Sequence, residues 1–169
     1  IDKAAIDFGM PMGPVELADT VGLDICLSVA NNLSELCQFE VPEVLVKKVE
    51  AKNLGKKSGS GFYHYKKGKI IKDRDADMGN QSEIQNRLIF RLLNESASCL
   101  REGIVDDKDL LDAGVIFGTG FAPFRGGPLN YGDETGVDEI QQNMKIYQER
   151  FGDRFQPDDA WSSLLANQE

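Results

Sequence analysis

The chain has 169 residues, 41% of them hydrophobic, and a formal net charge of −9 at pH 7. That length can bury one hydrophobic core or two smaller ones. The acidic balance argues against a nucleic-acid-binding protein, because neutralising phosphates requires clustered Lys and Arg, and no apolar run approaches the roughly 18 residues of a membrane-spanning helix.

The cysteines and the histidine restrict the chemistry further. Cys26, Cys37 and Cys99 are an odd number, and each falls among apolar residues on a predicted helix. This pattern favours buried, reduced thiols in a cytoplasmic protein over a disulfide framework. His64 is the single histidine, so the sequence predicts neither a zinc site nor a Ser-His-Asp triad.

The first half of the chain predicts helices separated by Gly and Pro. Gly13-Pro14 is typical of a helix start, since Pro suits the first helical position. Apolar residues then recur at steps of three and four over 23–37, which predicts an amphipathic helix. A shorter helix is expected to start at Pro42 and to end with Gly55 as its C-cap. The segment 62–71 predicts a small hairpin, which is the one β-structure we expect.

The second half begins with a polar, aperiodic stretch at 73–82 that predicts a linker. The strongest helical pattern follows over 83–102, and further helices are predicted over 107–116 and 137–151. The segment 161–165 indicates a weak terminal helix. We therefore predict an all-α fold.

The chain also repeats a motif. Residues 13–24 follow the pattern GP-x4-D-x2-GLD, and residues 127–138 follow GP-x4-D-x2-GVD. Upstream, Phe8-Gly9 matches Phe117-Gly118, with five extra residues before the second Gly-Pro. Such fixed spacing predicts two copies of one helical unit. The predicted boundaries are 1–72 for the first copy, 73–82 for the linker and 83–169 for the second copy.

The two copies are unequal. The second has the long helix at 83–102 before its Gly-Pro motif, whereas the chain starts at Ile1, just before the first Gly-Pro motif. We therefore expect the chain to be a piece of a longer protein, with the leading helix of the first copy upstream of Ile1.

The glycine-rich segments do not match nucleotide-binding motifs. Lys56, Lys57 and Ser58 precede Gly59, whereas a P-loop places its Lys-Ser/Thr after the final glycine. The G-x-G-x-x-G fingerprint would need a glycine at the position of His64. Neither paired carboxylates nor a nucleophile beside a base can be recognised, so the sequence alone predicts no catalytic, cofactor-binding or metal-binding residue.

Two of these segments have both a structural and a functional interpretation. The glycines at 55–61 form either a C-cap and a tight turn, or a loop that lets Lys56 or Lys57 contact a ligand phosphate. Met10 and Met12 either fill a core or form an adaptable apolar wall for an acyl chain.

Two sets of polar residues have a structural interpretation. Asp19 and Asp133 are expected to hold helix junctions by accepting backbone N–H bonds. Asn86-Arg87 is expected to form a solvated or interhelical polar pair.

Two ordered motifs carry a resemblance to a known family. "FGMPMGPVELADTVGLD" followed by "GKKSGSGFYHY" resembles the C-terminal helical domain of the 3-hydroxyacyl-CoA dehydrogenases, which has the 6-phosphogluconate dehydrogenase C-terminal-like fold. The second copy, from "NRLIFRLLNE" to "FGTGFAPFRGGP", is similar to the tandem C-terminal domains of the multifunctional fatty-acid β-oxidation enzyme, in which the dehydrogenase is fused to enoyl-CoA hydratase. The resemblance covers about residues 1–161.

This resemblance implies an oxidoreductase of lipid degradation that oxidises 3-hydroxyacyl-CoA to 3-oxoacyl-CoA in the whole enzyme. In that family an upstream Rossmann domain binds NAD and carries the catalytic His–Glu pair, while the helical domain shapes the acyl-CoA pocket and supplies dimer contacts. The resemblance thus implies a homo-oligomer that binds NAD outside this chain, and we expect the isolated chain to be inactive.

The residues expected to contact the acyl-CoA substrate are Met12, Gly13, Pro14, Lys56 and Lys57. No catalytic residue is carried over. His64 does not match the catalytic histidine, and Asn86 matches the family's substrate-contacting Asn only in the second copy.

Two alternatives remain open at this point. The chain could be a purely structural dimerisation and folding module without acyl-CoA contact, because the missing leading helix would leave an apolar groove near Ile6 and Leu17 for a neighbouring chain. It could also be the helical domain of another hydroxyacid dehydrogenase, although the "GFYHY" segment and the tandem copies argue against that.

Overall fold

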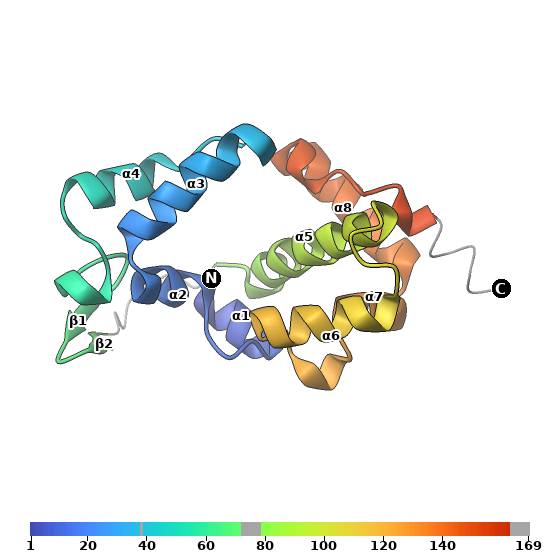
Figure 1. The fold of residues 1–169 in the computed structure, drawn as a ribbon, viewed down its shortest axis with the longest axis horizontal. Coiled ribbons are helices and arrows are strands. Elements are labelled where there is room, and N and C mark those ends of the chain that lie inside the picture. The colour runs from blue at the N-terminus through green and yellow to red at the C-terminus, as the bar shows by residue number, and fades with distance from the viewer. Residues whose placement is uncertain (38, 72–78, 163–169) are drawn as a thin grey trace. The chain divides into compact units, whose positions relative to one another are not determined.

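The computed structural model of the protein describes residues 1–37, 39–71 and 79–162 (Figure 1). The chain divides into two compact units. The first unit consists of Ile1–Lys3 and Met12–Gly79, and the second of Ala4–Pro11 and Asn80–Glu169. Helices dominate both units, and the described strands form one two-stranded sheet, so the predicted all-α fold is confirmed. Among the described helices, none has both the length and the hydrophobicity required to cross a bilayer.

Besides the start of α1 (Asp2–Phe8), the described residues of the first unit form three helices, one helical turn and a hairpin. The helix α1 begins in this unit and continues into the second. The other elements of the first unit are α2 (Pro14–Val21), α3 (Leu23–Cys37), α4 (Glu43–Glu50), η1 (Lys56–Ser58), β1 (His64–Lys66) and β2 (Lys69–Ile71).

Local sequence explains the limits of α2. Pro14 is its first residue, where the missing N–H costs no helical hydrogen bond. The helix ends at Gly22, whose N–H donates to the carbonyl of Ala18. The φ angle of Gly22 is 111°, a value that favours glycine because a Cβ would be strained there.

The end of α4 differs from the prediction. The helix stops at Glu50, and the backbone reverses at Lys52, whose φ is +60°. The predicted C-cap at Gly55 is therefore wrong. Gly55 instead opens the glycine-rich turn, where its N–H donates to the carbonyl of Ser60 at 2.8 Å.

The predicted hairpin is confirmed. Strands β1 and β2 pair antiparallel, with Tyr65 opposite Ile70. Lys67 and Gly68, between the strands, both have positive φ angles, 52° and 74°, as a two-residue hairpin turn of the I′ type requires.

The second unit contains the longest helix of the chain. Its elements after α1 are α5 (Gln81–Arg101), α6 (Lys108–Thr119), η2 (Pro123–Arg125), α7 (Pro128–Thr135), α8 (Val137–Phe151) and η3 (Asp153–Phe155). The side chain of Asn80 caps α5 by accepting the N–H of Glu83 at 3.1 Å, so the helix begins two residues before the predicted start. Most of the predicted linker (residues 73–78) and residues 163–165 of the predicted terminal helix lie outside the described residues.

One hydrophobic core holds the second unit together. α5 packs against α6, α7 and α8, and the end of α1 contributes Phe8, which is fully buried. The largest fully buried side chains of this core are Phe8, Leu93, Phe121, Leu129, Ile140, Met144 and Trp161.

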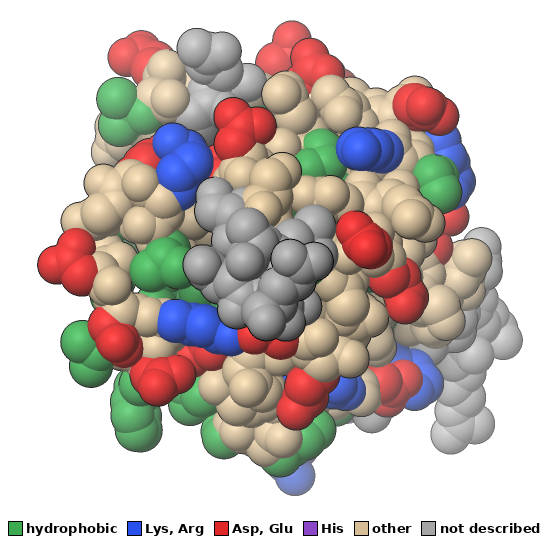
Figure 2. All heavy atoms as spheres, turned by 90° about the vertical axis from the view of Figure 1, so that its right-hand side faces the viewer, with side chains coloured by type: hydrophobic (Ala, Val, Ile, Leu, Met, Phe, Trp, Pro, Cys, Tyr) green, Lys and Arg blue, Asp and Glu red, His purple; other side chains and the backbone are tan. Residues whose placement is uncertain are grey.

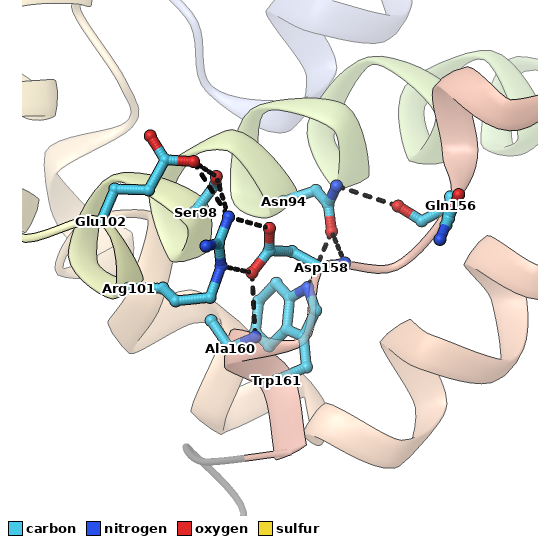
Figure 3. A network of polar contacts seen from close by, with 8 residues as sticks. All are labelled: Asn94, Ser98, Arg101, Glu102, Gln156, Asp158, Ala160 and Trp161. Atoms are coloured by element: carbon cyan, nitrogen blue, oxygen red, sulfur yellow. Dashed lines mark hydrogen bonds and ion pairs between the residues drawn. The ribbon is translucent and has the colours of Figure 1, made fainter.

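A network of polar contacts joins α5 to residues 156–161, near the C-terminal end of the described chain (Figure 3). Asn94 of α5 is 7% exposed. Its amide oxygen accepts the N–H of Asp158 at 2.8 Å and the indole N–H of Trp161 at 3.0 Å, while its amide nitrogen donates to the carbonyl of Gln156 at 3.1 Å. Arg101, about two turns further along α5, donates two hydrogen bonds to the Asp158 carboxylate. The segment 156–161 is thereby fixed to α5.

Candidate functional site

The candidate site lies in the first unit and is centred on the start of α2 and on Met12 and Gly13 just before it. Residues 8–14, which lead into α2, are called the first elbow. The Asp2 carboxylate accepts the N–H of Val15 at 2.8 Å and the N–H of Glu16 at 2.9 Å. These N–H groups are among those that a helix leaves without an internal partner at its N-terminus, and the helix dipole favours a negative charge there. Gly13 lies against Asp2 so closely that a Cβ on Gly13 would overlap the aspartate side chain.

The second repeat builds the same arrangement. The Asp112 carboxylate of α6 accepts the N–H of Leu129 at 2.7 Å and the N–H of Asn130 at 2.9 Å, and Gly127 lies against Asp112 as Gly13 lies against Asp2. In both repeats a buried aspartate therefore holds the start of the helix that follows Gly-Pro.

Sequence reasoning missed these aspartates, because extra residues before the second Gly-Pro displace Asp112 relative to the repeated motif. Counted from Asp2 and Asp112, Phe8 and Phe117 are out of register by one residue. Phe8 is fully buried and Phe117 is 89% exposed, so the predicted match between them is wrong. An aspartate early in the helix before each Gly-Pro is the signal that could have revealed the true register.

A second carboxylate ties the glycine-rich turn to α2 in the first unit. Asp19 is fully buried and accepts the N–H groups of Phe62 and Tyr63 at 2.9 and 2.8 Å, together with the hydroxyl of Tyr65 at 3.1 Å. The Tyr63 hydroxyl in turn donates to Asp2 at 2.8 Å. The start of α2, its buried aspartate and the "GFYHY" segment thus form one hydrogen-bonded network.

Both tyrosine hydroxyls remain neutral donors over a wide pH range. Burial, the hydrogen bond to Asp2 and the charge of that carboxylate raise the pKa of Tyr63 to about 12. Burial and the nearby charge of Asp19 also raise the pKa of Tyr65. Ionising either phenol would place a second negative charge beside a carboxylate, which the surroundings disfavour.

Asp19 and Asp133 were both expected to hold a helix junction by accepting backbone N–H groups. For Asp19 this expectation is confirmed in part. Asp19 accepts backbone N–H groups, but these belong to the turn before β1 and not to a helix junction. Asp133, the equivalent residue of the second repeat, forms an ion pair with Lys108. The guanidinium of Arg87 lies 3.9 Å from the ring centroid of Phe151, so this member of the Asn86-Arg87 pair packs between α5 and α8, which favours the interhelical interpretation.

The residues predicted to contact substrate are placed as follows. Met12 is 37% exposed and Pro14 is exposed, while Gly13 between them is buried against Asp2. The Lys57 ammonium lies 2.6 Å from the Asp24 carboxylate, and both side chains are exposed. The hydrogen bond from Lys57 is the main reason why the pKa of Asp24 is lowered. Lys57 therefore has a structural partner, which favours the structural interpretation of this lysine.

Lys56 lies at a polar pocket. The pocket has a volume of about 350 Å³ and is lined by Glu16, Thr20, Lys56, Tyr65, Gly68, Lys69 and Ile70. Lys56 is exposed and comes from the glycine-rich turn, whereas Glu16 comes from the first turn of α2. The structure thus brings Lys56 close to the start of α2, although the two are far apart in sequence.

An apolar pocket that sequence reasoning did not predict lies beside this network. It has a volume of about 530 Å³ and is lined mainly by Val15, Ala18, Cys26, Pro42, Leu45 and Phe62. Cys26 donates its thiol hydrogen to the Ala18 carbonyl at 3.6 Å, and burial raises its pKa, so the thiol is protonated at neutral pH. The pocket therefore offers an apolar surface and not a nucleophile.

The described residues form neither a Rossmann-type NAD site nor a cluster of metal ligands. A Rossmann-type NAD site requires a parallel sheet with a glycine-rich loop at its carboxyl end, whereas β1 and β2 form an antiparallel hairpin. No group of three His, Cys, Asp or Glu side chains within the described ranges could hold a metal ion.

On the face seen in Figure 2, acidic and basic side chains are interspersed, with acidic ones more frequent.

Comparison with known sequences identifies the family. The chain matches the family described as "3-hydroxyacyl-CoA dehydrogenase, C-terminal domain" over residues 1–65 and 84–169. The chain belongs to this family. The match falls in two segments, one in each half of the chain, in agreement with two helical repeats.

Relatives of this member of the family are much longer. The chain is 36% identical over 173 residues to the fatty acid oxidation complex subunit alpha of Shewanella loihica, and 38% identical over 170 residues to that of Vibrio vulnificus. Each alignment covers 94% of this chain and 24% of the relative. The chain therefore spans about a quarter of the length of the curated relatives it matches.

Solved structures share the fold. A 3-hydroxybutyryl-CoA dehydrogenase from Escherichia coli K12 superimposes with a TM-score of 0.75 at 20% identity, covering 99% of this chain and 55% of that chain. The dehydrogenase part of multifunctional enzyme 1 from C. elegans gives a TM-score of 0.71 at 24% identity, covering 97% of this chain and 41% of that chain. Both likenesses support the helical fold of the 3-hydroxyacyl-CoA dehydrogenase C-terminal domain.

Proposed function

We propose that this chain is the substrate-side helical part of an NAD-dependent 3-hydroxyacyl-CoA dehydrogenase of fatty-acid β-oxidation. In the full-length protein, a base would take the proton of the 3-hydroxyl group while the hydride on C3 passes to NAD⁺, giving 3-oxoacyl-CoA and NADH. The base and the NAD site belong to an upstream Rossmann domain outside this chain. An enoyl-CoA hydratase is fused to the same cytoplasmic, homo-oligomeric protein.

The family match over both halves of the chain is the observation that carries this proposal. The relatives named as alpha subunits of a fatty acid oxidation complex support the pathway. The first elbow and the apolar pocket beside it support a role toward the acyl group, because Met12 is partly exposed next to a helix start fixed by Asp2 and Tyr63.

An assay of the full-length protein and of this chain tests the proposal. The full-length protein should reduce NAD with 3-hydroxybutyryl-CoA, and this chain alone should not, because its described residues offer neither an NAD site nor a catalytic His–Glu pair. NADH oxidation by the isolated chain with acetoacetyl-CoA would refute the assigned division of labour. Absence of activity in the full-length protein would refute the proposed reaction.

The contact of the first elbow with substrate has its own test. In the full-length protein, Met12→Asp places a charge at a partly exposed apolar side chain and should raise the KM for acyl-CoA. Ile71→Asp on β2, where the side chain is 55% exposed, adds the same charge away from the elbow and serves as the control. Equal kinetics for the two variants would exclude Met12 from the acyl-CoA site.

A second candidate function, domain assembly, is favoured by an exposed apolar row in the first repeat. α2 and α7 each have eight residues and α3 and α8 each have fifteen, so positions correspond when counted from Pro14 and Pro128. Every fourth residue from Leu17 is large and apolar: Leu17, Val21, Ile25 and Val29, which are 45–51% exposed. The corresponding residues of the second repeat are Tyr131, Thr135, Glu139 and Asn143.

This row therefore has a task that the second repeat does not share. Exposed apolar rows of this kind mark interaction surfaces, and we assign the row to the part of the full-length protein outside this chain, which makes up most of the length of the relatives. The expected groove near Ile6 and Leu17 remains a prediction: each side chain is about half exposed, but the two belong to different compact units.

A double substitution in the exposed apolar row tests whether its partner is the rest of the full-length protein or a second copy of this chain. Val21→Ser with Ile25→Ser should lower the Tm of the full-length protein but leave that of the isolated chain unchanged, because these side chains are already half exposed in it. Thr135→Ser with Glu139→Ser, at the equivalent positions, is the control. If the isolated chain sediments as a dimer that the Val21/Ile25 variant dissociates, the partner is a second copy and the assignment is wrong.

A further inference from the structure

We infer that Arg125 of the second repeat is a positioning residue for the first elbow, and that the extra residues before the second Gly-Pro exist to hold that elbow. The part of this inference that concerns substrate binding rests on the proposed function, in which residues of the first elbow contact acyl-CoA. It gives the second repeat a role in holding the segment 8–11 that leads to the candidate site.

Arg125 binds the end of α1 directly. Its Nε–H donates to the carbonyl of Phe8 at 2.9 Å, one of the terminal carbonyls that a helix leaves unpaired. The guanidinium carbon lies 4.1 Å from the ring centroid of Phe8, 4.9 Å from that of Tyr131 and 5.3 Å from that of Phe124. A cation among three aromatic rings gains attraction from each ring, so Arg125 is fixed by stacking while it holds the Phe8 carbonyl.

The next residues of the elbow are enclosed by the same loop. A Cβ on Gly9 would lie 2.6 Å from Cζ of Phe124 and 2.9 Å from Cβ of Ala122, and a Cβ on Gly120 would lie 2.8 Å from Cγ of Pro11. Gly9 and the side chain of Pro11 are therefore packed against residues 120–124.

The segment that makes these contacts is the one in which the two repeats differ. Counted from Asp2 and Asp112, Gly9 corresponds to Thr119. The first repeat passes from Gly9 to Gly13 through "MPM", whereas the second has the longer stretch "GFAPFRG" between Thr119 and Gly127. Phe124 and Arg125 lie within this longer stretch. The additional residues of this stretch thus contact Phe8, Gly9 and Pro11 of the first elbow, all within the second unit.

The first part of the test measures backbone mobility in the full-length protein. Arg125→Met keeps an apolar stem but removes the donor and the charge. Arg91→Met is the matched control, because Arg91 also donates to a backbone carbonyl, that of Arg154, at 2.6 Å. We expect hydrogen exchange at the N–H groups of Gly9 and Met10, which are bonded to Ile6 and Ala5, to accelerate about tenfold or more in Arg125→Met only, as loss of a hydrogen bond from a charged group implies.

The second part measures kinetics. We expect Arg125→Met to raise the KM for 3-hydroxyacyl-CoA about threefold to tenfold with little change in kcat, since it removes binding geometry and no reacting group. The KM of Arg125→Lys should lie between those of Arg125→Met and the original protein. Lysine keeps the positive charge but cannot stack on the aromatic rings as the planar guanidinium does. Arg91→Met should leave both constants unchanged at a similar Tm.

Each result decides the inference. Unaltered exchange at Gly9 and Met10 in Arg125→Met, or the same acceleration in Arg91→Met, overturns it. Faster exchange with unchanged KM overturns the link to substrate. If the full-length protein lacks dehydrogenase activity altogether, the proposed function fails, while the exchange measurement still decides whether Arg125 positions the elbow.

Discussion

Gly127 lies so close to Asp112 that a Cβ on the glycine would occupy the space of the aspartate side chain. The contact lets Asp112 reach the N–H groups of Leu129 and Asn130. Gly127 also has a φ of +110°, which disfavours any side chain. Both conditions require glycine at this position.

Gly127→Ala should therefore destabilise the protein by about 2–4 kcal/mol, through backbone strain and the loss of one or both hydrogen bonds to Asp112. Urea unfolding followed by circular dichroism measures this change. Gly114→Ala in α6 is the control, because no atom lies within 4 Å of the position that a Cβ would take there and alanine favours a helix by up to about 1 kcal/mol. A loss of stability as large for Gly114→Ala would contradict the explanation.

Asn94 should be the most sensitive polar residue of the network in Figure 3. Asn94→Ala leaves the N–H of Asp158, the indole N–H of Trp161 and the carbonyl of Gln156 without their partner. An unpaired buried group costs about 1–3 kcal/mol. Because only the bond to the Trp161 indole is fully buried and the other two are partly accessible to water, we expect a loss of about 2–4 kcal/mol in the free energy of unfolding.

The control for Asn94 is Asn143→Ala. Asn143 makes one exposed hydrogen bond, to the carbonyl of Glu139 in its own helix, so its loss should change stability by about 0.5 kcal/mol or less. Fluorescence of Trp161, the single tryptophan, should also shift to longer wavelength in Asn94→Ala. A spectrum like that of the original protein would show that the network does not hold the indole.

The raised pKa of Tyr63 predicts a late ionisation. Its pKa is about 12, against an ordinary value of 10. The folded state therefore keeps a proton that the unfolded state loses, so the contribution of Tyr63 to stability is complete below pH 10 and is lost as the pH rises through about 12.

Stopped-flow absorbance after a pH jump tests this ionisation before the protein unfolds. At about pH 11, an ordinary tyrosine is mostly ionised, whereas Tyr63 is not. Tyr63→Phe should therefore give the same tyrosinate signal as the original protein at that pH. A signal smaller by one tyrosine of the four in the chain would mean that Tyr63 ionises normally and is not held by Asp2.

Asp158 should contribute to stability in a pH-dependent way. Burial would raise its pKa, but hydrogen bonds from Arg101 and from the N–H of Ala160 outweigh burial, and the pKa falls below its ordinary value of 3.8. For a carboxylate with a lowered pKa, the stabilisation is present above the unfolded value and disappears as the pH falls through the folded value.

Asp158→Asn should therefore lower the free energy of unfolding at pH 7 by about 0.5–1.5 kcal/mol, a small value because Arg101 is partly exposed. The difference from the original protein should vanish well below pH 3.8. Asp159→Asn, at an exposed neighbour, is the control and should leave the free energy of unfolding at pH 7 almost unchanged. A stability difference that stays constant down to acid pH would exclude the ion pair as its cause.

Several elements could be predicted from the sequence because their information is local. The helix predicted over 137–151 is α8, with the same limits, because its apolar residues recur at a helical spacing. The predicted helix start at Gly13-Pro14 is also confirmed, because a proline at the first helical position needs no partner elsewhere in the chain. The repeated Gly-Pro motif was visible for the same reason.

Other features depend on contacts between residues far apart in sequence. The spacing of the repeated motif did not reveal that Asp2 and Asp112 are equivalent, because the residues that separate each from its Gly-Pro differ in number. Phe8 and Phe117 looked equivalent by residue type, but one is in a core and the other is in solvent. Gly55 fitted a C-cap pattern, yet its N–H pairs with Ser60.

The sequence by itself determined that the chain is helical and duplicated, because helix periodicity, prolines and glycines act over a few residues. The tertiary structure decided that the start of each repeated helix is held by a buried aspartate, and that Phe8 of the first elbow is fixed by Arg125 of the second repeat. These contacts join positions far apart in the chain, and the energy of burying and pairing such groups is gained only when the folded backbone brings them together.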